Sequence, residues 1–176
     1  MASFFSHPAF PIALWVSKKA GGTKRLLVYS CLLTLLPDAD VIAFKFGIAY
    51  ESQWGHRGFT HSLVFAFLFA LFSMTFSRYF RAQKLTVFLW SFFSIASHIA
   101  FDALTDGGLG VAAFWPLTSE RYFFPFRPVY VSPIGVRGFL TGRGIMVVLN
   151  EILWLWLPCL TIAHLSKKMT FLNSRK

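Results

Sequence analysis

Three apolar runs constrain what this chain can fold into more than any other feature of its sequence. Ser62–Phe76 extends toward Phe80, Leu85–Leu104 carries one histidine and one aspartate near its end, and Ile145–Leu165 contains one glutamate near its start. A helix needs about 20 predominantly apolar residues to cross a bilayer. The three runs therefore predict three long membrane-spanning helices.

Two shorter apolar stretches, Pro8–Val16 and Leu26–Leu36, precede the long runs and are separated by Gly21-Gly22 with basic residues on both sides. They predict an N-terminal helical hairpin whose arms are each shorter than a full span. The expected fold class is an all-α, polytopic membrane protein of about five helices. We expect one membrane-embedded domain over residues 1–176, with irregular segments at about 38–60 and 106–143.

The composition agrees with a membrane protein and excludes other classes. Charged residues make up 14% of the chain and hydrophobic residues 56%, against about 25% charged residues in a soluble domain. The same balance excludes a disordered chain. The net charge is +10, but the basic residues flank apolar runs and form no continuous patch, so a nucleic acid is not an expected partner. The expected partner is the lipid bilayer.

The basic residues predict a topology. Eleven of the 17 lie in three groups that a five-helix path brings to one membrane face: Lys18, Lys19, Lys24 and Arg25; Arg78, Arg81 and Lys84; Lys167, Lys168, Arg175 and Lys176. Cytoplasmic loops carry an excess of Lys and Arg, so this face is predicted to be cytoplasmic. The opposite, outer face then carries the histidines and aspartates.

All four aspartates occur in two short clusters with histidines nearby. Asp38 and Asp40 precede a loop that contains His56 and His61, while His98 and Asp102 occur near the end of the fourth helix. His98 and Asp102 are four residues apart and so share one helix face. Asp106 continues that face if the helix reaches it, and His7 begins the first helix. The topology predicts that these groups converge at the outer membrane face.

Converging imidazoles and carboxylates are typical of a metal site, since His and Asp are common zinc ligands. Ionisable groups near bilayer depth are costly without a partner, and a cation offsets that cost. The predicted ion is zinc, with manganese as the alternative. The first-choice ligands are His61, His98, Asp102 and Asp38; further candidates, as ligands, orienting groups or a general base, are Asp40, His56, His7 and Asp106. A hydrogen-bonded polar network without metal remains an alternative.

Arginines near this cluster are candidates for binding an anionic substrate. Arg57 lies within the His56–His61 loop, and Arg121 and Arg127 lie in the long aromatic loop. A guanidinium binds phosphate in a bidentate manner, although these residues can also serve only to anchor lipid head groups. Arg57 can also stabilise developing negative charge. For Glu151, the sequence leaves open whether it snorkels, pairs with an arginine or faces the site.

At these residues the chain resembles the YdjM/YbcI-type inner-membrane proteins, a family described as LexA-binding, metal-dependent hydrolases. The shared elements are an early histidine, Leu36–Asp40, the His-Arg-Gly-x-Thr-His-Ser block at His56–Ser62, Ser97–Thr105 and Trp115-Pro116. One departure is Pro8 directly after His7. That family is in turn similar to zinc-dependent phospholipase C and to P1-type nucleases, helical enzymes with metal ions held by His and Asp. The resemblance implies a bacterial inner-membrane location and phosphoester hydrolysis.

The sequence thus predicts a membrane-bound, metal-dependent hydrolase in which a metal-activated water attacks a phosphoester such as a lipid head group. Asp40, Asp106 and Arg57 are the catalytic candidates beside the metal ligands, and Arg57, Arg121 and Arg127 are the candidates for substrate binding. Two other readings stay open. One is a structural or regulatory membrane protein whose metal or polar cluster only joins helices. The other is a transporter or ion relay.

Overall fold

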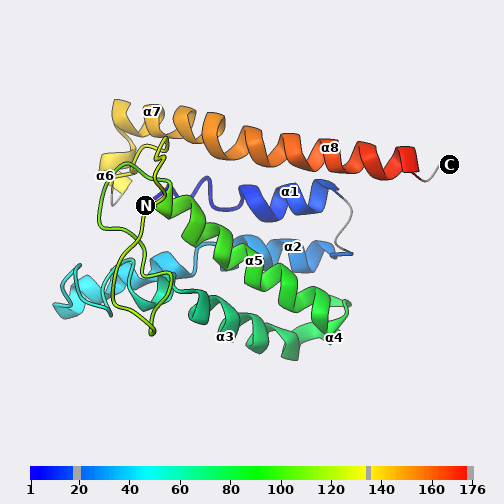
Figure 1. Ribbon diagram of the computed structural model, residues 1–176, viewed down its shortest axis with the longest axis horizontal. Helices are drawn as coiled ribbons and strands as arrows, with labels where there is room; N and C mark the ends of the chain where they lie inside the picture. Colours follow the sequence, from blue (N-terminus) through cyan, green and yellow to red (C-terminus); the bar gives the residue numbers. More distant parts are fainter. Residues whose placement is uncertain (18–20, 134–135, 174–176) are drawn as a thin grey trace.

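A computed structural model describes residues 1–17, 21–133 and 136–173, and among them it contains helices and connecting segments but no β-strand. Four segments are long and apolar enough to span a membrane: Lys24–Phe46, Leu63–Phe80, Lys84–Ala103 and Gly142–Met169. The predicted polytopic helical fold class is confirmed, including the three long runs (Figure 1).

The N-terminal hairpin consists of α1 (Ala9–Ser17) and α2 (Lys24–Leu33). The side chain of Thr23 accepts a hydrogen bond from the Leu26 amide and so caps the first turn of α2. The first arm, α1, is as short as predicted. The second arm is longer than predicted, because further helical residues follow α2 and extend the apolar segment to Phe46. The predicted basic residues Lys18 and Lys19 lie outside the described residues, as do Arg175 and Lys176.

The segment expected to be irregular from residue 38 begins with a 3₁₀ helix, η1 (Pro37–Phe46). Pro37 has no amide hydrogen, so the α-helical hydrogen-bond pattern cannot continue through it, and the chain resumes in a tighter helix. Asp38 and Asp40 lie in the first turn of η1, where negative charge is favourable. Gly47 ends the helix with φ +73°, a conformation that suits glycine.

A second hairpin carries the longest buried helix. After the short 3₁₀ helix η2 (Phe59–His61), α3 (Leu63–Ser73) begins with Ser62 as its cap and continues through η3 (Met74–Phe76) and α4 (Ser77–Phe80). The chain then returns as α5 (Lys84–Ala103). Leu33, Ala66 and Ile95 join α2, α3 and α5 in one apolar core.

The long loop after α5 ends in α6 (Val136–Phe139) and α7 (Gly142–Glu151). One π-helical turn, η4 (Ile152–Trp156), connects α7 to α8 (Leu157–Asn173). Within the loop, the Asp106 amide donates to the Val129 carbonyl at 2.9 Å, and Val111 pairs with Tyr122. The loop therefore returns to the end of α5 and covers it.

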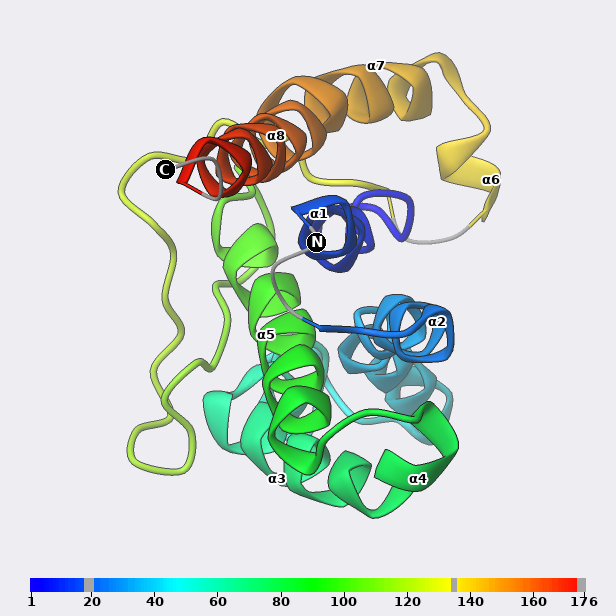
Figure 2. The same ribbon diagram turned by 90° about the vertical axis from the view of Figure 1, so that its right-hand side faces the viewer.

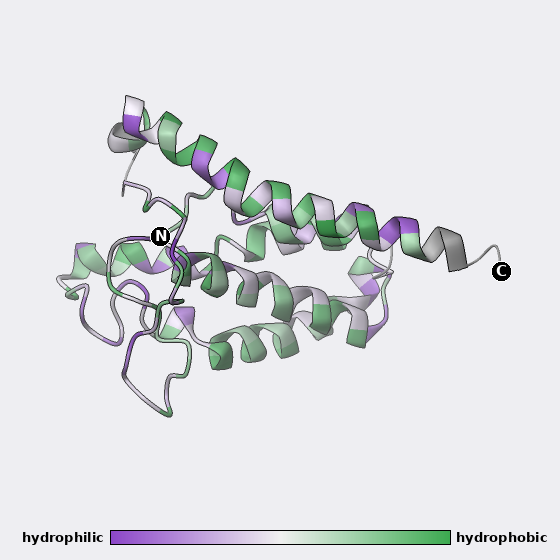
Figure 3. Ribbon diagram, turned by 45° about the horizontal axis from the view of Figure 1, so that its top comes forward, coloured by the Kyte–Doolittle hydropathy of each residue, from purple (hydrophilic) through white to green (hydrophobic). Residues whose placement is uncertain are grey.

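The helices form a bundle whose two ends differ. The start of α2, the α4–α5 turn and the C-terminal end of α8 lie at one end, whereas η1, the long loop and the N-terminus lie at the other (Figure 1). Viewed along the helices, α1 lies between α8 on one side and α2 and α5 on the other (Figure 2). Apolar residues dominate along the helices, and polar residues gather mainly in the connecting segments (Figure 3).

Candidate metal centre

Four side chains from three segments meet at the loop end of the bundle. Asp38 comes from η1, His61 from η2, and His98 and Asp102 from the last two turns of α5. Both histidines and Asp102 are fully buried, whereas the Asp38 side chain is 13% exposed. The structure therefore brings together the four residues that the sequence ranks first.

The facing atoms of this Asp38–His98 cluster are spaced like metal ligands. The two imidazole Nε2 atoms of His61 and His98 lie 3.0 Å apart, and Asp38 Oδ1 lies 3.5 Å from each of them. Asp102 Oδ2 lies 3.5 Å from His61 Nε2. Ligand atoms about 2.0–2.2 Å from a tetrahedral zinc ion are roughly 3.3–3.6 Å apart. The three 3.5 Å separations fall in this range, the two Nε2 atoms lie closer together, and all four donor atoms are within 4.8 Å of one another.

Hydrogen bonds behind the rings fix which nitrogen faces the cluster. His98 Nδ1 donates to the Thr34 carbonyl at 2.7 Å, while His61 Nδ1 lies 3.1 Å from Thr60 Oγ1. The Thr60 hydroxyl in turn donates to Asp40 Oδ2 at 2.6 Å. With Nδ1 protonated in both rings, the two Nε2 atoms face each other beside two carboxylates and share one hydrogen bond at 3.0 Å. Outer partners of this kind orient metal-binding imidazoles, so both rings present Nε2 to the position where the four side chains could hold an ion.

Several buried polar atoms at this end have no hydrogen-bond partner. They are Asp38 Oδ1, both ring nitrogens of His7, and His56 Nε2. An unpaired buried polar group costs about 1–3 kcal/mol. A cation held by Asp38 would give its unpaired Oδ1 a partner.

His7 lies directly against the cluster. Its ring stacks on the His98 ring with 3.8 Å between centroids, and its Nε2 lies 3.7 Å from Asp38 Oδ2 and 3.8 Å from Asp102 Oδ1. The ring thus faces the carboxylate oxygens that point away from His61. Pro8 does not displace the ring from the cluster, although His7 is not among the side chains whose donor atoms converge there.

Asp40 holds the surrounding loop rather than facing the four donors. Its Oδ1 accepts from His56 Nδ1 at 2.7 Å, and its Oδ2 accepts from the Arg57 amide at 3.2 Å and from Thr60. His61 Nδ1 is 3.3 Å from the same oxygen, so Asp40, His56 and His61 form a second group of donors. His56 keeps a free, buried Nε2.

Electrostatics favour positive charge at His61. Burial desolvates the ring and opposes protonation, but the neighbouring Asp102, Asp38 and Asp40 outweigh burial and raise the pKa of His61 to about 10. Three carboxylates around one imidazole stabilise a bound cation for the same reason.

Arg57 points inward and is fully buried. Its Nε donates to Asp102 Oδ2 at 3.1 Å, and Nη2 donates to Thr105 Oγ1 at 2.9 Å. Nη1 donates to the carbonyls of Gly107 and Leu109. Gly108, with φ +81°, passes so close that a Cβ there would lie 3.1 Å from Nη1. With each of its three nitrogens hydrogen-bonded to the protein, Arg57 orients Asp102.

The other two candidate arginines lie farther from the cluster. Arg121 donates to the carbonyls of His56, Tyr50 and Ser52 at 2.9–3.1 Å, so it holds the loop over the site. Arg127 is exposed and lies over the Phe123 ring at 4.7 Å. Of the three, Arg127 has the guanidinium most accessible to a ligand.

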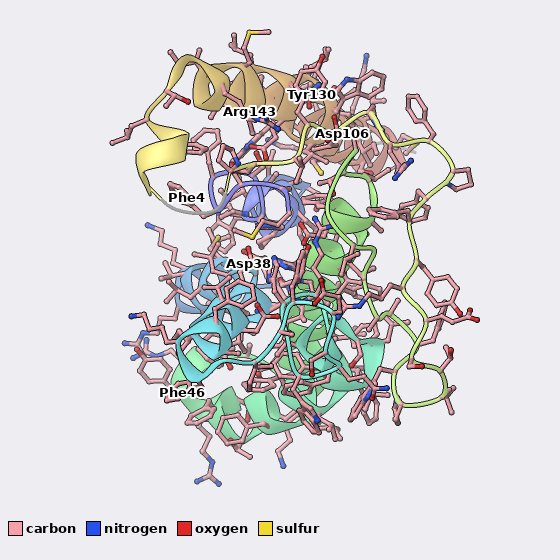
Figure 4. All side chains as sticks on the ribbon, turned by 90° about the vertical axis from the view of Figure 1, so that its left-hand side faces the viewer. Phe4, Asp38, Phe46, Asp106, Tyr130 and Arg143 are labelled. Carbon is pink, nitrogen blue, oxygen red and sulfur yellow. The ribbon has the colours of Figure 1, made fainter. Side chains whose placement is uncertain are left out.

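Asp106 does not reach the cluster. The α-helix ends at Ala103, and Asp106 Oδ1 accepts from the Val131 amide at 2.8 Å in the long loop. Figure 4 shows Asp106 beside Tyr130, apart from Asp38 at the centre of this end. The predicted continuation of the His98–Asp102 face fails because the backbone after Leu104 pairs with Val129 instead of continuing the helix.

Glu151, which the sequence leaves undecided, holds the N-terminal segment. Fully buried, it accepts hydrogen bonds from the Ser3 amide, the Ser3 hydroxyl and, at 2.8 Å, the Ser6 hydroxyl. The segment ends in His7, so Glu151 helps to place that ring. Its position inside an apolar run was the available signal, since ionisable residues at such positions have specific partners.

Comparisons with known proteins agree with this architecture. A family profile described as "YdjM inner membrane protein" matches residues 1–173. The Escherichia coli (strain K12) protein named "Inner membrane protein YbcI" is 40% identical over 163 residues, covering 90% of this chain and 92% of that protein. No solved structure matches the chain significantly. The relatives support a multi-pass location in the inner membrane.

Proposed function

The chain belongs to the YdjM inner membrane protein family, and on that premise we propose that it is a metal-dependent hydrolase of phosphoesters such as phospholipid head groups. The observation that carries the proposal is the Asp38–His98 cluster, in which two imidazole nitrogens and two carboxylate oxygens face one point. Zinc is the proposed ion, with manganese as the alternative, because both accept His and Asp ligands.

In the proposed mechanism, His61, His98, Asp38 and Asp102 would hold the ion, which would supply Lewis acidity for hydrolysis and, with four protein donors, would have to expand its coordination to bind a water as well. Arg57 keeps the Asp102 carboxylate oriented, and Asp40 keeps His56 and His61 oriented. His56 Nε2, buried and unpaired, is the proposed proton acceptor. Asp38, the partly exposed member of the cluster, marks the side from which substrate enters.

We place this site at the periplasmic face. The described basic residues at the start of α2, at the α4–α5 turn and in α8 lie at the opposite end of the bundle (Figure 1). By the positive-inside rule that end is cytoplasmic. Arg127, exposed in the loop at the site's end, is the proposed contact for an anionic head group.

The test is to measure metal in detergent-purified protein by elemental mass spectrometry and then to assay phosphoester hydrolysis before and after chelation. We expect near-stoichiometric zinc or manganese, at one or more ions per chain, and hydrolysis that chelation removes and metal restores. Folded protein without metal, never exposed to a chelator, would refute the proposal. Stoichiometric metal without hydrolysis of any phosphoester would favour a purely structural ion, the reading that the burial of three of the four donors supports.

A further inference from the structure

An apolar groove runs along the bundle between α1 and α8. Its cavity volume is about 280 Å³. On each helix the lining residues follow the spacing i, i+3, i+4 and i+7: Phe10, Ala13, Leu14 and Ser17 on α1, and Cys159, Ile162, Ala163 and Ser166 on α8. That spacing gives each helix one continuous face along the groove. The groove therefore follows the helix axes instead of ending in a closed pocket.

Small side chains create the hollow. Ala13 and Ala163 lie on the facing sides of α1 and α8, while the bulkier Phe10 and Ile162 border the groove. Because alanine fills little of the space between two helices, the lining atoms lack partners on one side and lose dispersion contacts there. An apolar occupant would restore those contacts.

The groove lies in the part of the molecule that faces lipid. The lining residues of α8 belong to the candidate membrane span Gly142–Met169, and Ile162 is 65% exposed. Hydrocarbon chains rather than water surround such a segment. The nearest apolar ligand is therefore a lipid acyl chain.

The length of α1 distinguishes an acyl chain from a partner helix. Its nine residues extend about 14 Å, roughly half of the 30 Å hydrocarbon core. A groove of that length matches one leaflet, which is the reach of one lipid tail. A membrane-spanning partner helix would require a groove about twice as long.

One end of the groove lies near the metal centre along the chain. Phe10 is the groove residue nearest the N-terminus and follows His7 by three residues. The His7 ring stacks on the His98 ring with 3.8 Å between centroids. The groove therefore begins on the segment that also carries His7, which is the basis for relating an acyl chain in the groove to a head group at the cluster.

We propose that the α1–α8 groove binds one acyl chain of a membrane glycerophospholipid and thereby selects long-chain lipids as substrates. The proposal rests on the hydrolase function for its catalytic consequence, but lipid binding in the groove is independent of it. The free energy of binding the acyl chain in the groove then increases the rate of hydrolysis at the head group.

The test compares Ile162→Trp, which fills the groove, with Leu165→Trp as a matched control. Both residues are exposed aliphatic side chains of α8, and Leu165 does not line the groove. Native mass spectrometry measures retained phospholipid, and an assay compares long-chain with short-chain phospholipids. We expect Ile162→Trp to lower lipid retention and to reduce the long-chain to short-chain turnover ratio by about tenfold, with Leu165→Trp unchanged.

The outcomes separate the two proposals. If neither lipid is hydrolysed but Ile162→Trp alone loses bound phospholipid, the groove assignment holds and the hydrolase proposal fails. Equal retention and equal turnover ratios in both variants overturn the groove assignment and leave the hydrolase untouched. A dimer of the wild-type protein that Ile162→Trp alone dissociates would identify a second copy as the occupant and would also overturn the proposal.

Discussion

Two carboxylate groups at the same end of the bundle, Glu151 and the partly exposed Asp38, differ in how far the protein satisfies their oxygens. The Glu151 oxygens accept three hydrogen bonds from Ser3 and Ser6. By contrast, Asp38 Oδ1 has no hydrogen-bond partner, and neither nitrogen of the adjacent His7 has one. A satisfied buried carboxylate needs no further partner, whereas buried polar atoms without one require an explanation such as strain, a catalytic role or a bound ion. The comparison therefore shows Glu151 holding the fold and is the basis for proposing the Asp38–His98 cluster as the functional site.

The largest expected effect is a loss of bound metal, which a change in the Asp38–His98 cluster should cause and a change at Glu151 should not. His98→Ala removes one donor and should lower metal affinity by more than the roughly 10–100-fold typical of losing an outer hydrogen-bond partner. His164→Ala, an exposed histidine of α8, is the matched control and should retain the wild-type metal content. Elemental analysis of folded, gel-filtered protein measures both, and equal metal in the two variants would contradict the ligand assignment.

Glu151→Ala should act on stability instead. It leaves the Ser3 amide and the hydroxyls of Ser3 and Ser6 without their buried acceptor, which should cost roughly 2–4 kcal/mol of unfolding free energy. Glu151→Gln keeps one acceptor oxygen and should lose less. Denaturation in detergent, with Glu120→Ala in the exposed loop as the control, measures the difference. A wild-type midpoint for Glu151→Ala would undo the contrast between the two carboxylates.

Asp40 is intermediate between Glu151 and Asp38. Its oxygens accept hydrogen bonds, as those of Glu151 do, but the side chain also contacts His61 of the cluster. Asp40→Asn keeps the size of the side chain and weakens its hold on His56 and His61. We expect metal affinity to fall by roughly 10–100-fold, because outer partners fix ligand orientation and basicity. Competition with a calibrated chelator measures the affinity, and an unchanged value would show that Asp40 only holds the loop.

The smallest effect is expected at Asp106. Asp106→Asn retains the oxygen that accepts from the Val131 amide, and the residue does not reach the cluster. Metal content and chelator competition should match the wild type. A clear loss of metal would place Asp106 at the centre after all and would revise the end of α5.

The sequence predicted much of the candidate site. Spacing placed His98 and Asp102 on one helix face, and the topology brought Asp38 and His61 to the same end. It misplaced Asp106, because where a helix ends depends here on a loop segment 23 residues later, at Val129. It also could not assign Arg57 an inward orientation, since the partners Asp102 and Thr105 are distant in sequence.

By itself, the sequence determined the helical membrane class, because apolar run length and charge distribution act locally and leave few other folds in a bilayer. It also fixed the residue types available at the loop end. Only the tertiary structure decided their chemistry: which nitrogens face one another, which carboxylate is satisfied, and which arginine is buried. Hydrogen bonds such as His98 Nδ1 to the Thr34 carbonyl join residues 64 positions apart. Such contacts exist only once the helices pack.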